Sequence, residues 1–201
     1  MIESMPYKPK FIQQSRLSQR LWLILLTLAG SGFLALSAQV AIPMVPVPLT
    51  LQTLGLLILG VTLGWRVGGL SVLAYLAEGA MGLPVFANGS GGAHLFVGPT
   101  AGYLLGFPLV TIIAGWTSEK LMPRLRANRS FIHGLGLASL VWIGFTVAQT
   151  ACLLLGGAWL AVLLNSTDKA WQFGIQPFLI GEVIKSTLAL FALQAAVRLQ
   201  R

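Results

Sequence analysis

Hydrophobic residues fill most of this 201-residue chain in long runs, which short segments rich in polar residues, glycine or proline separate. An apolar run of about 20 residues is typical of a helix that crosses the hydrocarbon core of a membrane. The pattern predicts six such spans, at residues 21–42, 50–63, 67–83, 99–121, 134–160 and 177–197. Because the second and third are short and only residues 64–66 separate them, we expect these two to be thin, tilted or extended by their flanking loops.

The composition agrees with a membrane protein. Charged residues make up 9% of the chain and hydrophobic residues 56%, whereas an average soluble domain has about 25% charged residues. The six spans leave no room for a separate soluble domain of ordinary size. We therefore predict one integral membrane domain over residues 1–201.

Positive charges gather in alternate loops, so the net charge of +8 indicates topology and not nucleic-acid binding. If the six spans alternate, one side of the membrane receives Lys8, Lys10, Arg16, Arg20, Arg66, Lys120, Arg124, Arg126, Arg129, Arg198 and Arg201. The opposite loops contain only Lys169, beside Asp168. The positive-inside rule then places both termini in the cytoplasm, with residues 1–20 as a cytoplasmic segment.

A cleavable signal peptide over residues 1–38 is the alternative interpretation of the first span. The long polar lead-in and an apolar run long enough to span argue against it. Losing this segment would also leave an odd number of spans.

Two irregular segments fall on the predicted outer side. One is "IPMVPVPLTLQT" at residues 42–53, and the other is "GLPVFANGSGGAHLFVGPTAGYLLGF" at residues 82–107. Prolines at this spacing do not fit an ordinary helix, and irregular backbone at membrane depth survives only where protein buries it or where it lines a wet cavity. Together these segments predict a cavity that opens outward.

The glycine-rich loop matches no enzymatic motif. His94 occupies the place of the third glycine of a GxGxxG phosphate-binding motif, and no GK[ST] sequence follows. The "NGSG" at residues 88–91 only partly matches the GxSG of rhomboid-type proteases, and neither His94 nor His133 lies where a catalytic base would be needed. A flexible cap over a ligand and a plain extracellular connector both remain open.

Ionisable residues within the spans are the sharper signal, because a charge inside a membrane is costly and usually marks a functional site. Glu182 and Lys185 lie three residues apart in the last span, on one face of a helix. They either neutralise each other as a structural pair or offer an acceptor and a donor to a polar ligand. Glu78 in the third span is a third such group, and Gln52 and Gln149 are weaker polar candidates.

A stripe of small residues, Ser31, Ala35 and Ala38, follows one face of the first span. Such stripes allow another helix to approach closely. The spacing does not distinguish packing within the chain from docking of another membrane subunit.

Four ordered motifs, "VPVPLTLQTLGLLILG", "YLAEGAMGLPVFANGSGG", "GPTAGYLLGF" and "GEVIK", resemble the BioY family. Its members are the substrate-capturing S components of biotin transporters of the energy-coupling factor (ECF) type. The resemblance runs from about Ala35 to the end of the last span. It implies an all-α membrane protein, a bundle of six transmembrane helices in which the irregular outward-facing loops cap a ligand cavity.

The resemblance also implies the site and its partners. Biotin would be bound by Asn88, Glu182 and Lys185, with Tyr103 and Glu78 as further substrate-binding candidates. Glu182 stands where the family usually has Asp, which lengthens the acceptor by one methylene. The small-residue contact of the family corresponds to Ser31, Ala35 and Ala38, with a serine in place of an expected alanine.

The function implied is high-affinity biotin uptake across the cytoplasmic membrane of a prokaryote, with a transmembrane T component and two cytoplasmic ATPases as partners. An S-component-like transporter for another small vitamin or a biotin analogue is the alternative, and a membrane-embedded enzyme is the second. We predict no catalytic residues, metal ligands or cofactors. No ATP-binding motif occurs in the chain, so the energy for uphill transport must come from partners.

Overall fold

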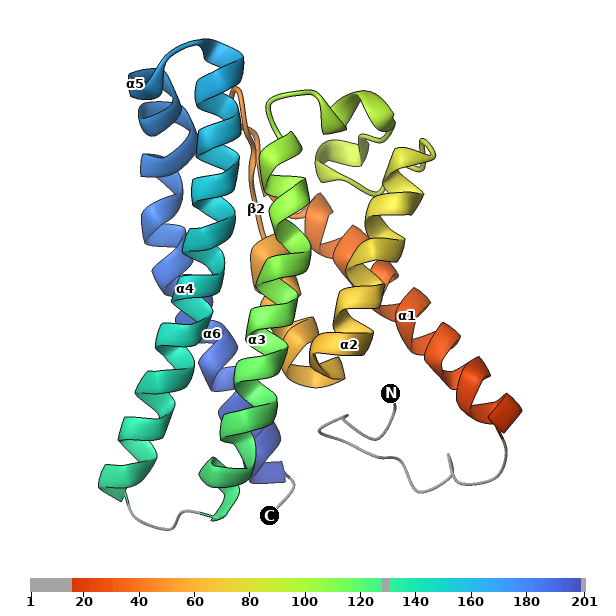
Figure 1. Ribbon diagram of the computed structural model, residues 1–201, viewed down its shortest axis with the longest axis vertical. Helices are drawn as coiled ribbons and strands as arrows, with labels where there is room; N and C mark the ends of the chain where they lie inside the picture. Colours follow the sequence, from red (N-terminus) through yellow and green to blue (C-terminus); the bar gives the residue numbers. More distant parts are fainter. Residues whose placement is uncertain (1–15, 128–130, 200–201) are drawn as a thin grey trace.

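A computed structural model describes residues 16–127 and 131–199 (Figure 1). Its long helices are α1 (Arg16–Gln39), α2 (Gln52–Ala80), α3 (Ala101–Ala127), α4 (Phe131–Leu164) and α6 (Leu179–Leu199). Two short strands, β1 (Ala41–Ile42) and β2 (Leu49–Thr50), pair antiparallel between α1 and α2. The remaining elements are single turns of helix, namely η3 (Ala87–Gly89), η4 (Ala93–Phe96), α5 (Thr167–Ala170), η5 (Trp171–Ile175) and η6 (Gln176–Phe178).

Five helical segments among the described residues are long and apolar enough to cross a membrane. The predicted count of six separate spans is therefore not confirmed. The difference lies in residues 52–80, predicted as two short spans and found as the single element α2 of 29 residues. A hydrogen bond shows that this element is bent: Gln52 at its start donates to the Tyr75 hydroxyl near its other end, over 2.6 Å. A straight helix would separate these residues by about 35 Å, so α2 folds back on itself (Figure 1).

The reversal occurs at Gly64, inside the 64–66 linker that separates the predicted second and third spans. Gly64 has φ 74° and ψ 172°, a backbone conformation that is essentially restricted to glycine. The Gly64→Ala variant is therefore expected to lower the free energy of unfolding by about 1–3 kcal/mol. Denaturant-induced unfolding in detergent would measure the change.

Gly32→Ala is the matched control, because Gly32 lies in α1 and a Cβ there would meet no atom within 4 Å. Alanine is the better helix former, so this variant should be as stable as the wild type or slightly more stable. Equal stability of the two variants would contradict the role assigned to Gly64.

Helix α3 packs closely against both arms of α2. A Cβ added to Gly115 of α3 would lie 2.4 Å from the Trp65 backbone nitrogen, and one added to Gly60 would lie 2.7 Å from the Thr111 carbonyl oxygen. Small residues at such contacts let helix backbones approach in a membrane. The carboxylate of Glu119 also accepts a hydrogen bond from the Trp65 backbone N–H, over 3.3 Å, just after the reversal.

Helix α1 leans away from the other helices at its start and joins them near its end (Figure 1). In its second half Ser31, Leu34 and Ala38 are buried, and Ala35 packs against the core. The first half exposes a set of large apolar side chains, Leu17, Leu21, Ile24, Leu25 and Leu28. The stripe of small residues therefore faces the rest of the chain, which favours packing within the chain. Docking of a partner at these positions gains no support from this arrangement.

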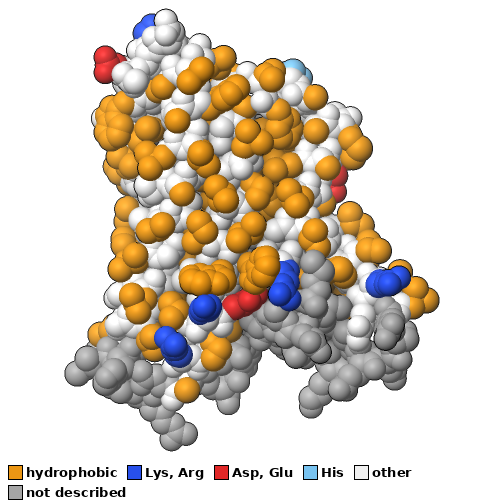
Figure 2. Space-filling model, in the orientation of Figure 1, with side chains coloured by type: hydrophobic (Ala, Val, Ile, Leu, Met, Phe, Trp, Pro, Cys, Tyr) orange, Lys and Arg blue, Asp and Glu red, His pale blue; other side chains and the backbone are white. Residues whose placement is uncertain are grey.

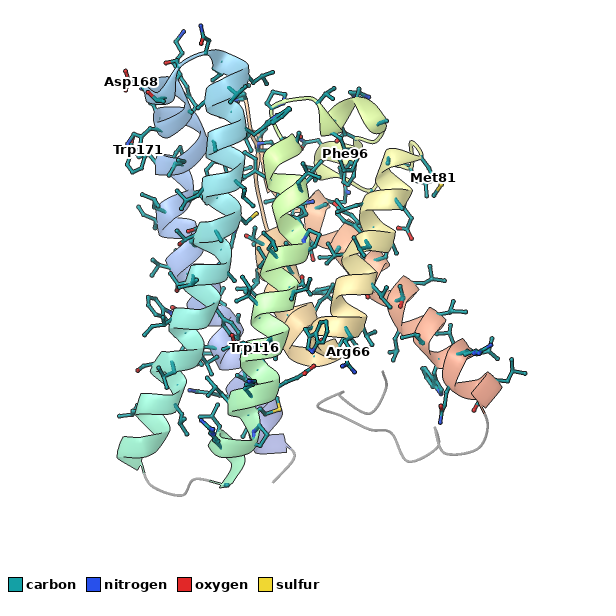
Figure 3. All side chains as sticks on the ribbon, in the orientation of Figure 1. Arg66, Met81, Phe96, Trp116, Asp168 and Trp171 are labelled. Carbon is teal, nitrogen blue, oxygen red and sulfur yellow. The ribbon has the colours of Figure 1, made fainter. Side chains whose placement is uncertain are left out.

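Most of the cations seen in Figure 2 lie near one end of the molecule, and one lies at the opposite end beside an acidic side chain. Arg66 lies at the end with most of the cations and Asp168 at the other (Figure 3). Arg20 near the start of α1 and Lys120 and Arg124 near the end of α3 also belong to elements that reach this end (Figure 1). The described residues thus have the predicted one-sided charge distribution. The cations at positions 8, 10, 129 and 201, and most of the predicted N-terminal segment, lie outside the described residues.

Candidate functional site

A cavity of about 270 Å³ lies among β2, the start of α2, the loop between α2 and α3, and helices α3, α4 and α6. Both irregular segments contribute to its lining. Thr50 and Thr53 come from the first segment, and Phe86, Asn88 and Thr100 come from the second. A small-molecule site is typically a mostly apolar cavity with a few placed polar groups, and this cavity has that character.

Glu182 and Lys185 are both in the lining, one turn apart on α6, and the side chain of each is 8% exposed. The Lys185 ammonium donates to the Thr50 carbonyl oxygen over 2.7 Å and to the Thr53 hydroxyl over 2.9 Å. These bonds connect α6 to the proline-rich segment and to the start of α2. They use two of the three ammonium protons. The third proton has no partner among the described residues and can bond to a ligand.

The Glu182 carboxylate is held more loosely than the Lys185 ammonium. The Thr150 hydroxyl of α4 donates to Glu182 Oε2 over 3.4 Å, beyond the usual range for such a bond. A carboxylate offers about four acceptor positions. Glu182 can therefore accept a hydrogen bond from a ligand without breaking a strong contact within the protein.

Tyr103 and Asn88 also lie in the lining. The Tyr103 hydroxyl donates to the Gly174 carbonyl oxygen over 2.6 Å, so Tyr103 supplies an aromatic wall and keeps its hydroxyl engaged elsewhere. Asn88 adopts the left-handed conformation in η3, with φ 58°. Asparagine tolerates this conformation better than most residues with a Cβ, and its position in the loop places it over the cavity.

Glu78 is not among the residues that line this cavity. Its carboxylate instead accepts a hydrogen bond from the Ser31 hydroxyl of α1. The structure therefore brings together four of the five predicted substrate-binding residues and places the fifth at the interface between α1 and α2.

Several lining residues had no role in the sequence-based prediction. Thr50 and Thr53, which hold Lys185, lie in the proline-rich segment, and only that segment's irregularity pointed to the cavity. The aromatic walls Phe86, Phe107 and Phe178 come from three different elements. Their periodicity is that of ordinary core residues, so no local signal distinguishes them.

Gln39, the last residue of α1, fastens the loop over the cavity. Its side-chain Nε2 donates to the Phe86 carbonyl oxygen over 3.2 Å, and its Oε1 accepts from the Gly89 backbone N–H over 3.1 Å. The Gly92 N–H also donates to the Gly79 carbonyl oxygen over 2.7 Å, which connects the loop to the end of α2. The turn that carries Asn88 is thus attached at both ends.

Gln39→Ala is expected to increase amide hydrogen exchange at Gly89 by roughly two- to tenfold, because it removes one net hydrogen bond of ordinary strength. Hydrogen–deuterium exchange of residues 86–92, followed by mass spectrometry, measures the effect. Ser37→Ala is the control, since among the described residues the Ser37 hydroxyl donates only to the Phe33 carbonyl oxygen of its own helix. Equal exchange in the two variants would show that Gln39 does not hold the loop.

A protein-family model described as the BioY family matches residues 12–201, which is nearly the whole chain. The chain belongs to the BioY family. The resemblance carried by the four sequence motifs is thereby confirmed. Membership, together with several apolar helices, makes the chain a multi-pass membrane protein.

Individual BioY proteins align over most of their length. The biotin transporter BioY of Rhodobacter capsulatus is 46% identical over 172 residues, covering 79% of this chain and 85% of the relative. The biotin transporter BioY of Thermotoga maritima is 36% identical over 159 residues, covering 79% and 86%. The probable biotin transporter BioY of Pyrococcus horikoshii is 34% identical over 155 residues, covering 77% and 83%.

One solved structure has the same fold as this BioY chain. It is described as the crystal structure at 2.1 Å of the S-component for biotin from an ECF-type ABC transporter. The two superpose with a TM-score of 0.72 and 25% sequence identity, covering 93% of this chain and 95% of the other. The all-helical S-component fold predicted from the motifs is therefore the fold found here.

Proposed function

We propose that this chain is the biotin-binding, substrate-specific subunit of an ECF-type vitamin uptake transporter. One observation carries the proposal: the chain matches the S-component for biotin over 93% of its length. In support, its cavity contains an acceptor, Glu182, and a donor, Lys185, one helical turn apart. Relatives from three organisms that are named as certain or probable biotin transporters support the same substrate. Membership of this family supports a transport role over an enzymatic one.

The chemistry of biotin fits the lining of the cavity. Its ureido ring has two N–H donors and a strong carbonyl acceptor, its bicycle and tail are apolar, and it ends in a carboxylate. Glu182 accepts a ureido N–H in this proposal, and Lys185 uses its remaining proton to donate to the ureido carbonyl. Aromatic and apolar walls bury the bicycle, and the tail points toward the loop, where Asn88 completes the hydrogen bonds.

The proposed topology has six membrane-crossing segments, because the two antiparallel arms of α2 count separately. The positively charged end, which contains Arg66, faces the cytoplasm of a prokaryotic cell, and both termini lie on that side. The loop between α2 and α3 then faces outward and acts as the lid over the cavity. A transmembrane T component and two cytoplasmic ATPases supply the energy for the reorientation that releases biotin inside.

Equilibrium binding of labelled biotin to the purified protein in detergent or nanodiscs tests the proposal. We expect saturable binding that unlabelled biotin displaces. Absence of binding at micromolar biotin would reject biotin as the substrate. Stronger displacement by another small vitamin or by a biotin analogue than by biotin itself would favour the alternative of a related S component with a different ligand.

A further inference from the structure

Gln149 of α4 is a buried glutamine in the lining of the cavity, with 1% of its surface exposed. Its side-chain Nε2 donates to the Glu182 carbonyl oxygen over 3.0 Å and to the Ser186 hydroxyl oxygen over 2.8 Å. A backbone carbonyl only accepts hydrogen bonds, so the NH₂ group must face Glu182. This contact fixes the orientation of the amide and directs its oxygen away from α6's backbone.

The Gln149 Oε1 atom has no hydrogen-bond partner among the described residues, although it is buried. Buried side-chain oxygens without a partner are uncommon in folded proteins. A second buried glutamine in the same lining, Gln52, shows the ordinary arrangement. Its Oε1 accepts from the Thr50 hydroxyl over 2.8 Å and its Nε2 donates to Tyr75. The Gln149 oxygen is thus an acceptor that the described residues leave unused.

The side chains of Gln149 and Glu182 together form one set of hydrogen-bond acceptors. The two residues are neighbours because the Gln149 Nε2 donates to the Glu182 carbonyl oxygen. The set combines a neutral oxygen from α4 with a carboxylate from α6. A cyclic urea has two N–H groups, one on each side of its carbonyl, and burying it requires an acceptor for each. Lys185 has no acceptor to offer, since an ammonium only donates. Glu182 alone satisfies one of the two N–H groups.

We propose that Gln149 is a substrate-recognition residue whose side-chain oxygen accepts a hydrogen bond from the second ureido N–H of biotin. This inference rests on the proposed function and extends it. It makes the site specific for a ring with two N–H donors, one of which meets a charged acceptor and the other a neutral one.

The test compares biotin with its two analogues that carry a methyl group on one or the other ureido nitrogen. In the wild type both analogues should bind more weakly than biotin, because each loses one of two bonded N–H groups. In Gln149→Leu, biotin should bind roughly tenfold more weakly. The variant should prefer biotin much less than the wild type does over one analogue, the one whose methyl group replaces the N–H that bonds to Gln149. Its preference for biotin over the other analogue should be that of the wild type.

Thr111→Val is the matched control, since Thr111 is a buried polar residue outside the lining whose hydroxyl donates to the Leu56 carbonyl oxygen over 3.1 Å. It should preserve the wild-type preference for biotin over both analogues, even where the protein is less stable. If Gln149 only held α4 against α6, its substitution would lower the stability of the protein without changing the preference between ligands. If Gln149→Leu does not yield folded protein, Gln149→Met has a similar length and replaces it.

Two results would overturn the inference. One is an unchanged preference for biotin over both analogues in the Gln149 variants. The other is a wild type that binds one analogue as tightly as biotin, because one N–H would then have no protein acceptor and the Gln149 oxygen would be occupied by water. Both results leave biotin binding by the wild type intact. A wild type that does not bind biotin rejects the proposed function, and the Gln149 assignment with it, so the two failures are distinguishable.

Discussion

Glu182→Ala is expected to bind biotin roughly 10- to 100-fold more weakly than the wild type. The variant removes a hydrogen bond between a charged acceptor and a ligand N–H, and bonds to charged groups contribute about 1.5–3 kcal/mol. The fold should survive, because the Lys185 ammonium keeps its bonds to Thr50 and Thr53. Equilibrium binding of labelled biotin measures the affinity, and thermal unfolding in detergent measures the stability.

Three further substitutions sharpen this prediction. Glu182→Gln keeps the shape and one acceptor oxygen, so it should lose less affinity than Glu182→Ala. Glu182→Asp shortens the side chain by one methylene and tests whether its reach matters at this position. Glu78→Gln changes a glutamate of α2 that lies outside the cavity lining, and this variant should bind biotin as the wild type does. Wild-type affinity in Glu182→Ala, or a large loss in Glu78→Gln, would contradict the assigned site.

Lys185→Met is expected to lose both affinity and stability. Biotin should bind roughly 10- to 100-fold more weakly, because the donor to its carbonyl is lost. The free energy of unfolding should fall by about 3 kcal/mol, since two charge-assisted bonds to the segment before α2 disappear and Glu182 stays buried beside an apolar side chain. Ligand binding and denaturant-induced unfolding of the same preparation separate the two effects.

Thr53→Val is the companion variant, because it removes one internal partner of Lys185 without touching the ammonium. It should lose a small part of the stability and keep most of the affinity. Equal losses of affinity in Thr53→Val and Lys185→Met would show that the lysine only positions the segment around Thr50. A Lys185→Met protein that binds biotin as the wild type does would exclude the lysine from the site.

Features that depend on local sequence could be predicted from the chain alone. The loop that carries Asn88 and the segment around Thr50 interrupt apolar runs, and irregular backbone at membrane depth must be buried in protein or line a cavity. Glu182 and Lys185 share a helical face because they are three residues apart. The sides on which Arg66 and Lys120 lie follow from counting spans.

Features that depend on pairing between distant residues could not be predicted. The partner of Glu78 is Ser31, 47 positions earlier, and nothing in the spacing of either residue connects them. The same holds for Lys185 and Thr50, which are 135 positions apart. Gln149 resembled any glutamine that joins two helices, and only the structure shows that its Oε1 has no partner among the described residues. The chain reverses at Gly64, inside the break predicted at residues 64–66, but the backbone conformation of that glycine could not be predicted from the sequence.

The attachment of the loop to Gln39 has a mechanical consequence. Helix α1 contacts the bundle tightly at Gly30, where an added Cβ would lie 2.4 Å from the Ser71 hydroxyl oxygen. The part of α1 before this contact is about 20 Å long and presents mostly leucine and isoleucine to its surroundings. Because α1 packs tightly at Gly30 and is bonded to the loop at Gln39, a displacement of this helix would be transmitted to the turn that carries Asn88.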